Sequence, residues 1–120
     1  MAGPRVLVID DEPLMRLSLR RLLRREGFEV LLAGGGEEGF TLVQRNRPSV
    51  IVLDMRMPGM DGAQFLAALR QEPALAAIPV VAISANAELL PQGVAAAFAK
   101  PFEPIQFLAE VRRCSPKPFR

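Results

Sequence analysis

Apolar residues in this 120-residue chain follow two alternating patterns. Short uninterrupted runs of Val, Ile and Leu recur, and the stretches between them place apolar residues three or four positions apart. Uninterrupted runs are typical of parallel strands that are buried on both faces, and the wider spacing indicates amphipathic helices. The alternation predicts repeated strand-then-helix units.

The apolar runs predict five strands, at residues 5–9, 28–33, 49–53, 80–84 and 95–99. Helices are expected from Pro13 to a stop at Gly27, from about 37 to 45, from a cap at Asp61 to a stop before Pro73, and from Pro104 onward. Proline suits the first turn of a helix, and aspartate suits the position just before it. The apolar helix faces are Met15, Leu19, Leu22 and Leu23, then Phe65, Leu66 and Leu69, then Phe107, Leu108 and Val111.

This order of elements predicts an α/β fold. Parallel strands need crossover connections, and strands that are apolar throughout need helices on both faces of the sheet. The chain is long enough for one domain over residues 1–120 and has no internal repeat or linker. Only the tail, 115–120, reads as irregular, because it contains two prolines.

Composition excludes several kinds of chemistry. Histidine is absent, so the chain has no imidazole metal ligand and no Ser-His or Cys-His pair. One cysteine, Cys114, allows no internal disulfide and favours a reducing, cytoplasmic setting. No apolar run is long enough to span a membrane. A net charge of +2 is too small to indicate nucleic-acid binding.

Acidic residues stand where two of the predicted strands end. Asp10 and Asp11 follow the first strand, and Asp54 follows the third. Ligands of open parallel sheets bind beyond the carboxyl ends of the strands, near the point where strand order reverses. Three carboxylates brought together there would repel one another unless a cation intervenes, and oxygen ligands suit Mg²⁺ or Mn²⁺.

Two further strand ends carry groups that suit a phosphoryl ligand. Ser84 ends the fourth strand, and Lys100 follows the fifth. The lysine and a metal ion can neutralise phosphoryl oxygens, while the hydroxyl can donate a hydrogen bond. A carboxylate is then the best nucleophile that these strand ends offer.

Four motifs in this order resemble the receiver domain of two-component response regulators. They are VLVIDDEP at residues 6–13, VLDMRMPGMDG at 52–62, VVAISA at 80–85 and KPF at 100–102. The resemblance covers essentially the whole chain. It implies a flavodoxin-like, doubly wound, five-stranded parallel sheet.

The resemblance also implies a role for each site residue. Asp54 would accept a phosphoryl group from a phosphohistidine on a histidine kinase or phosphotransfer protein. Mg²⁺ would be held by Asp10, Asp11, Asp54 and the backbone carbonyl of Arg56, directly or through water. Ser84 would be the switch hydroxyl, and Lys100 would contact the phosphoryl oxygens. Such a domain is a cytoplasmic signalling switch rather than an enzyme, and it acts on an output domain or a downstream protein.

Two features depart from the family pattern. The segment between Ser84 and Lys100 is shorter than usual and contains Pro91 and Gly93, so a full fourth helix is not expected. The family commonly has an aromatic residue three positions before the lysine, where this chain has Ala97, and the ring stands one residue later, at Phe98. Because strand side chains alternate faces, this ring is expected on the other side of the sheet unless a bulge intervenes.

Other interpretations remain open from the sequence. A phosphatase of the haloacid dehalogenase type also uses Asp, Ser or Thr, Lys and Mg²⁺, but it carries two acids separated by one residue after the first strand. A flavin-binding module would have a phosphate loop rich in Ser, Thr and Gly there. Glu12 reads as a loop or capping residue. The arginines of the first helix read as a solvated face, without direct nucleic-acid binding. The chain could also be one part of a longer protein with an output domain.

Overall fold

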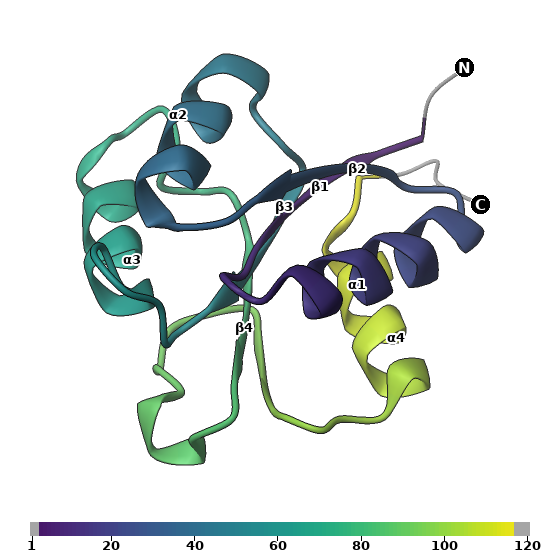
Figure 1. Cartoon of the computed structure of the whole chain (residues 1–120). Helices are drawn as coiled ribbons and strands as arrows, with labels where there is room; N and C mark the ends of the chain where they lie inside the picture. The colour runs from purple at the N-terminus through teal and green to yellow at the C-terminus, as the bar shows by residue number, and fades with distance from the viewer. Residues whose placement is uncertain (1–2, 117–120) are drawn as a thin grey trace.

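The computed structural model of the chain describes residues 3–116. A parallel five-stranded sheet lies between two layers of helices (Figure 1). The strands are β1 (Arg5–Ile9), β2 (Glu29–Ala33), β3 (Val50–Asp54), β4 (Val80–Ser84) and β5 (Ala96–Ala99), in the order β2-β1-β3-β4-β5. The helices are α1 (Pro13–Arg25), α2 (Gly36–Asn46), α3 (Gly62–Gln71), the short 3-10 turn η1 (Ala87–Leu89) and α4 (Pro104–Cys114). The predicted α/β fold is confirmed.

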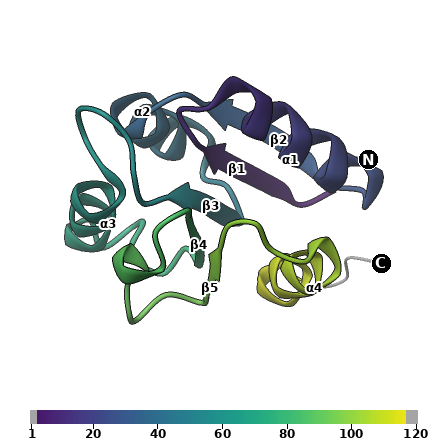
Figure 2. The same ribbon diagram turned by 60° about the horizontal axis from the view of Figure 1, so that its bottom comes forward.

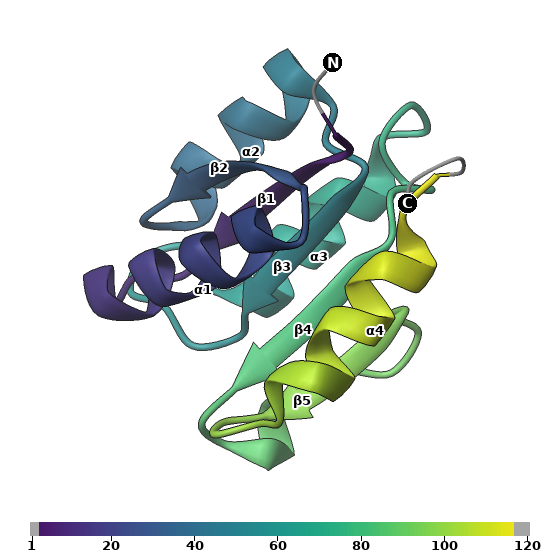
Figure 3. The same ribbon diagram turned by 90° about the vertical axis from the view of Figure 1, so that its right-hand side faces the viewer.

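Each face of the sheet packs against two helices. Helices α1 and α4 lie side by side on one face, while α2 and α3 cover the other (Figure 3). Strands β1 and β3 supply alternate residues to the two cores, so Val6 and Val52 face α1 and α4, whereas Leu7 and Leu53 face α2 and α3. Burial of both faces explains the uninterrupted apolar runs of these central strands.

Local signals set the helix ends. Pro13 occupies the first turn of α1, and Gly27 follows the helix with φ of 97°, a conformation that glycine adopts without strain. The Asp61 side chain accepts a hydrogen bond from the backbone N–H of Gln64, whose side chain in turn accepts one from the backbone N–H of Asp61. This capping box confirms the predicted start of α3.

The connection from β4 to β5 contains no α-helix in the part of the chain that the structure describes. It carries only η1, and Figure 2 shows it as an open loop beside α3. Leu90 and Val94 pack against the core beneath α3, and Arg70 of α3 donates a 2.6 Å hydrogen bond to the carbonyl of Gly93. The expected loss of a full fourth helix is confirmed.

Strand β5 pairs with β4 in a regular register without a bulge, with Ala97 opposite Ala82 and Phe98 opposite Ile83. Ala97 is exposed on the face that α2 and α3 cover elsewhere, because no helix lies over this part of β5. Phe98 lies on the opposite face, where its ring centroid is 5.9 Å from that of Phe107 in α4. The aromatic ring therefore points away from the uncovered face, as the one-residue offset predicts.

No helix among residues 3–116 is long and apolar enough to cross a membrane. Helix α4 ends at Cys114, so Ser115 and Pro116 are the described part of the tail that was expected to be irregular. The rest of that tail, 117–120, lies outside the described residues.

The start of α3 leaves no room for a side chain at Gly62. A Cβ atom there would lie 2.6 Å from the Cα of Met55 and 2.8 Å from the carbonyl oxygen of Asp54. Gly62→Ala must therefore displace backbone rather than a flexible side chain, and we expect it to lower the free energy of unfolding by about 1–3 kcal/mol. Urea denaturation followed by circular dichroism would measure the loss.

Gly35→Ser is the matched control for this prediction. Nothing lies within 4 Å of a Cβ at Gly35, which is the N-cap of α2, where serine is favoured. The control variant should be at least as stable as the wild type. Equal stability of the two variants would contradict a steric role for Gly62.

Candidate functional site

The carboxyl ends of β1 and β3 bring three acidic side chains together. Ile9 pairs with Leu53 in the parallel register, so the residues that follow, Asp10 and Asp54, are neighbours. Strand order reverses between these two strands, because the chain adds β2 on one side of β1 and β3 on the other. One carboxylate oxygen from each of Asp10, Asp11 and Asp54 lies within 4.8 Å of the others.

Asp10 is held in place from several directions. Its side chain is completely buried, and its carboxylate accepts hydrogen bonds from the backbone N–H of Glu12 at 2.9 Å and from Lys100 Nζ at 3.0 Å. The guanidinium of Arg16 donates to the Asp10 carbonyl at 2.7 Å. A buried charge needs such partners, so the orientation of Asp10 depends on Lys100.

Lys100 reaches back from the end of β5 to the acidic cluster. Its Nζ atom lies 3.5 Å from Asp54 Oδ2, in addition to its hydrogen bond to Asp10. Burial lowers the pKa of the Lys100 ammonium, but the hydrogen bond that Lys100 donates to Asp10 and the charges of Asp10, Asp54 and Glu12 outweigh burial and raise this pKa above its ordinary value. The lysine therefore stays protonated at neutral pH.

After Asp10, Asp54 is the most buried carboxylate of the cluster. Burial raises the pKa of Asp54 to about 6, and the negative charge of Asp10 adds to this effect. The backbone N–H of Arg56 donates to Asp54 Oδ1 at 3.2 Å, and this bond and the Lys100 charge act in the opposite direction. A positive charge in addition to that of Lys100 would therefore stabilise the ionised carboxylate of Asp54.

The donor set fits a small hard cation. Three carboxylates share the site with a single ammonium group, so negative charge is in excess. Oxygen ligands in this number, with room for water on the partly exposed side of Asp11, suit Mg²⁺, which keeps several waters when bound.

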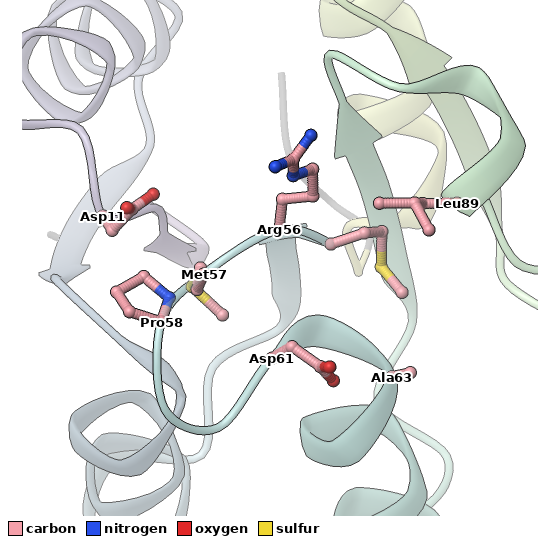
Figure 4. Close-up of a pocket in the computed structure, with 8 residues that line it drawn as sticks. Asp11, Arg56, Met57, Pro58, Asp61, Ala63 and Leu89 are labelled. Carbon is pink, nitrogen blue, oxygen red and sulfur yellow. The ribbon is translucent and has the colours of Figure 1, made fainter.

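A surface pocket of about 490 Å³ adjoins the cluster on the side of the β3–α3 loop. Its lining residues are Asp11, Met55, Arg56, Met57, Pro58, Asp61, Ala63 and Leu89. Figure 4 shows Asp11 on one side of this pocket and Leu89 on the other, with the Arg56 side chain extending between them. Arg56 therefore adjoins the site, while the predicted metal contact of its backbone carbonyl stays a prediction.

Ser84 lies at the same edge of the sheet but outside this cluster of contacts. It is fully buried, and its hydroxyl oxygen accepts a hydrogen bond from the backbone N–H of Asn86 at 3.0 Å. Its carbonyl accepts one from the backbone N–H of Lys100 at 2.8 Å, which fixes the lysine backbone beside it. The switch role of its hydroxyl stays a prediction.

Glu12 has a contact that the sequence did not reveal. It stands at the N-cap of α1 as expected, but its side chain makes no capping hydrogen bond. Instead its Oε1 atom lies 3.5 Å from Lys100 Nζ. No local signal could have revealed this contact, because the two residues are 88 positions apart in the sequence.

The chain is similar to known proteins in sequence and in fold. A family model described as the response regulator receiver domain matches residues 6–112. The chain is 33% identical over 114 residues to the DNA-binding response regulator MtrA of Mycolicibacterium smegmatis, covering 90% of this chain and 49% of that protein. It is 37% identical over 118 residues to the transcriptional regulatory protein PrrA of Mycobacterium tuberculosis, covering 93% and 50%. The chain thus spans about half the length of these relatives.

Among solved structures, the chain is similar to the chemotaxis protein CheY4 of Vibrio cholerae. The TM-score is 0.83 at 27% sequence identity, and the match covers 94% of this chain and 99% of that one. The similarity in fold therefore extends over nearly the whole chain.

We expect Mg²⁺ to bind at the acidic cluster and to stabilise the fold. At ten times the dissociation constant, binding would raise the free energy of unfolding by roughly 1.4 kcal/mol. Asp11→Asn should abolish this gain, because the site then has two charged carboxylates, both already in contact with Lys100. Urea denaturation at increasing Mg²⁺ concentration would measure both effects.

Glu72→Gln is the matched control for this titration. Glu72 is an exposed acid at the C-terminal end of α3, whereas the cluster adjoins the N-terminal end of this helix. Its loss should leave the Mg²⁺ response unchanged. If Mg²⁺ gives no saturable stabilisation that Asp11→Asn removes, the metal site is wrong.

Proposed function

Since the chain belongs to the response regulator receiver domain family of two-component signalling, we propose that Asp54 accepts a phosphoryl group from a phosphohistidine on a partner protein. Receiver domains of this family are phosphorylated by histidine kinases. The partner here is a histidine kinase or a histidine phosphotransfer protein. We further propose that residues 1–120 form one receiver domain.

One observation carries this proposal. The carboxylate of Asp54 stands at the switch point of the sheet, with Lys100 Nζ 3.5 Å from its Oδ2 atom and the Asp10 and Asp11 carboxylates beside it. A nucleophile, a fixed cation and metal-binding oxygens are the groups that phosphoryl transfer requires.

The chemical step follows from these positions. A carboxylate oxygen of Asp54 attacks phosphorus, the new O–P bond forms as the P–N bond of the phosphohistidine breaks, and the leaving imidazole nitrogen takes a proton. The ammonium of Lys100 pairs with the phosphoryl oxygens, and the Ser84 hydroxyl moves toward them and donates a hydrogen bond. Mg²⁺, held by Asp10, Asp11, Asp54 and the Arg56 carbonyl, would neutralise charge on the phosphoryl oxygens.

Other functions have less support. No comparison supports a haloacid dehalogenase-type phosphatase, and receiver domains are typically signalling domains rather than enzymes. A flavin-binding module is disfavoured because the acids at the end of β1 would repel a phosphate in the absence of metal. We propose that this chain is a cytoplasmic switch without a turnover reaction of its own.

The protein on which the switch acts lies outside the geometry of the site. The relatives named above are a DNA-binding regulator and a transcriptional regulator, each about twice as long as the matched region. We propose that this domain controls an output domain or a separate protein and does not itself bind nucleic acid. The exposed arginines of α1, Arg21, Arg24 and Arg25, then form a solvated helix face.

Acetyl phosphate with Mg²⁺ should add one base-labile phosphoryl group to the protein. A carboxyl-phosphate anhydride hydrolyses readily in base, and Asp54→Asn should reduce the incorporation to background because the amide is a poor nucleophile. Lys100→Ala should retain some phosphorylation and lose much of the conformational response. Intact-protein mass spectrometry before and after base treatment would measure the phosphorylation.

Asp61→Asn is the matched control, because it removes an acid from the same loop and asparagine still caps α3. It should be phosphorylated like the wild type. A phosphoryl group recovered on serine, or undiminished in Asp54→Asn, would overturn the assignment.

We do not expect this chain to pass on its signal through the surface that the family usually uses. That route uses the fourth helix and an inward-turning aromatic ring, whereas this chain has only η1, with Ala97 on the open face and Phe98 packed against α4. We propose that phosphorylation changes the loops at 55–59 and 84–92 without stable dimerisation through this region.

Size-exclusion chromatography with light scattering, with and without beryllofluoride and Mg²⁺, tests this proposal. We expect a monomer in both conditions, because the surface that the ordinary dimer uses is incomplete. A monomer-to-dimer shift that Phe98→Ala abolishes would show that the ordinary output route survives.

A further inference from the structure

Glu12 is the one carboxylate in contact with Lys100, among the described residues, that does not belong to the metal cluster. The other two contacts of Lys100 Nζ are to Asp10 and Asp54, at 3.0 and 3.5 Å. Glu12 Oε1 lies 3.5 Å from the same nitrogen, on the solvent side. The lysine is thus held between the buried acids and an acid at the mouth of the site.

The backbone of Glu12 is fixed while its side chain is free to reach the lysine. Its N–H donates to Asp10 Oδ1 at 2.9 Å, and its carbonyl accepts from the backbone N–H of Arg16 at 3.0 Å. Its side chain makes no capping bond to α1 and is 65% exposed. The carboxylate is therefore available to the ammonium of Lys100.

A cation or a phosphoryl group at the site would change which of its carboxylate contacts matters most to Lys100. A cation bound by Asp10 and Asp54 would compensate their charge and weaken their attraction for Lys100, whereas Glu12 is not one of the carboxylates that would hold it. A phosphoryl group on Asp54 then offers Lys100 new anionic oxygens, and Glu12 competes with them for one ammonium group. The flexible stem of lysine lets it exchange between such partners.

From this arrangement we propose that Glu12 is a positioning residue that holds Lys100 at the mouth of the site and thereby weakens its pairing with the phosphoryl group. The inference rests on the proposed function of Asp54. By this effect Glu12 limits the stability of the phosphorylated state.

Beryllofluoride, a noncovalent phosphoryl mimic, tests the role of Glu12 directly. Its affinity would be measured by fluorine NMR at saturating Mg²⁺, since the chain has no Trp or Tyr for intrinsic fluorescence. Glu12→Gln should bind beryllofluoride about two- to fivefold more tightly than the wild type, the range expected for a solvent-exposed ion pair. Unchanged or weaker binding would overturn the proposal.

Glu12→Asp separates the contact with Lys100 from simple charge repulsion. Aspartate keeps the charge, but its shorter side chain favours the amides at the start of α1 and cannot hold the lysine in the same way. We expect Glu12→Asp to bind beryllofluoride more tightly, as Glu12→Gln does. Wild-type affinity in Glu12→Asp would mean that only the charge matters and would overturn the positioning role.

Glu103→Gln is the matched charge control. Glu103 is exposed, follows Lys100 by three residues and has no side-chain capping bond to α4. The Glu103→Gln variant should bind beryllofluoride with the affinity of the wild type. A gain in affinity as large as in Glu12→Gln would overturn the specific role of Glu12. Absence of beryllofluoride binding by the wild type would instead overturn the proposed function of Asp54.

Discussion

The functional edge of this sheet depends on the ion pairs between Lys100 and the carboxylates of Asp10 and Asp54. Asp10 is fully buried, and an unpaired charge in that position would strongly oppose folding. One ammonium cannot compensate three neighbouring carboxylates, so the site keeps an excess of negative charge. That excess prepares the site for a cation. Burial, and after it the charge of Asp10, raises the pKa of Asp54 to about 6.

The strand order places these charges where chemistry can use them. The strand order reverses between β1 and β3, which run parallel, and both strands are buried on each face. The residues at their carboxyl ends need not be apolar, so Asp10 and Asp54 can stand side by side at this edge of the sheet on a rigid base, although both are buried. The close packing of Gly62 against Met55 and the Asp54 carbonyl then holds the β3–α3 loop beside the site.

The β4–β5 connection, in contrast, leaves part of the sheet uncovered. A short turn replaces a helix, so one face of β5 is left exposed at Ala97, and Leu90 and Val94 cover only part of the core. The acidic site at the ends of β1 and β3 is therefore held by many contacts, whereas the surface at β4 and β5 is incomplete. Under the proposed function, the signal accepted at Asp54 would be passed on through other surfaces.

The sequence by itself determined the strands, the helix starts and the side of the sheet that Phe98 occupies. These features depend on local spacing: apolar runs set the strands, Asp61 and Gln64 form a capping box, and alternation along β5 fixes the ring. The sequence also indicated which acids end β1 and β3, because equivalent strand ends meet at one edge of a parallel sheet. The roles of Asp54, Ser84, Lys100 and the Arg56 carbonyl remain predictions from resemblance.

Only the tertiary structure decided which groups touch one another at that edge. Lys100 contacts Asp10 across 90 positions of sequence and Glu12 across 88, and no periodicity or motif encodes such distances. The contact to Glu12 depends on the rotamer of an exposed side chain, whose choice between capping α1 and pairing with Lys100 follows from the position of the lysine. Local sequence fixes the backbone of Glu12, whereas the packing of β5 beside β4 fixes the position of Lys100, with which the Glu12 side chain pairs.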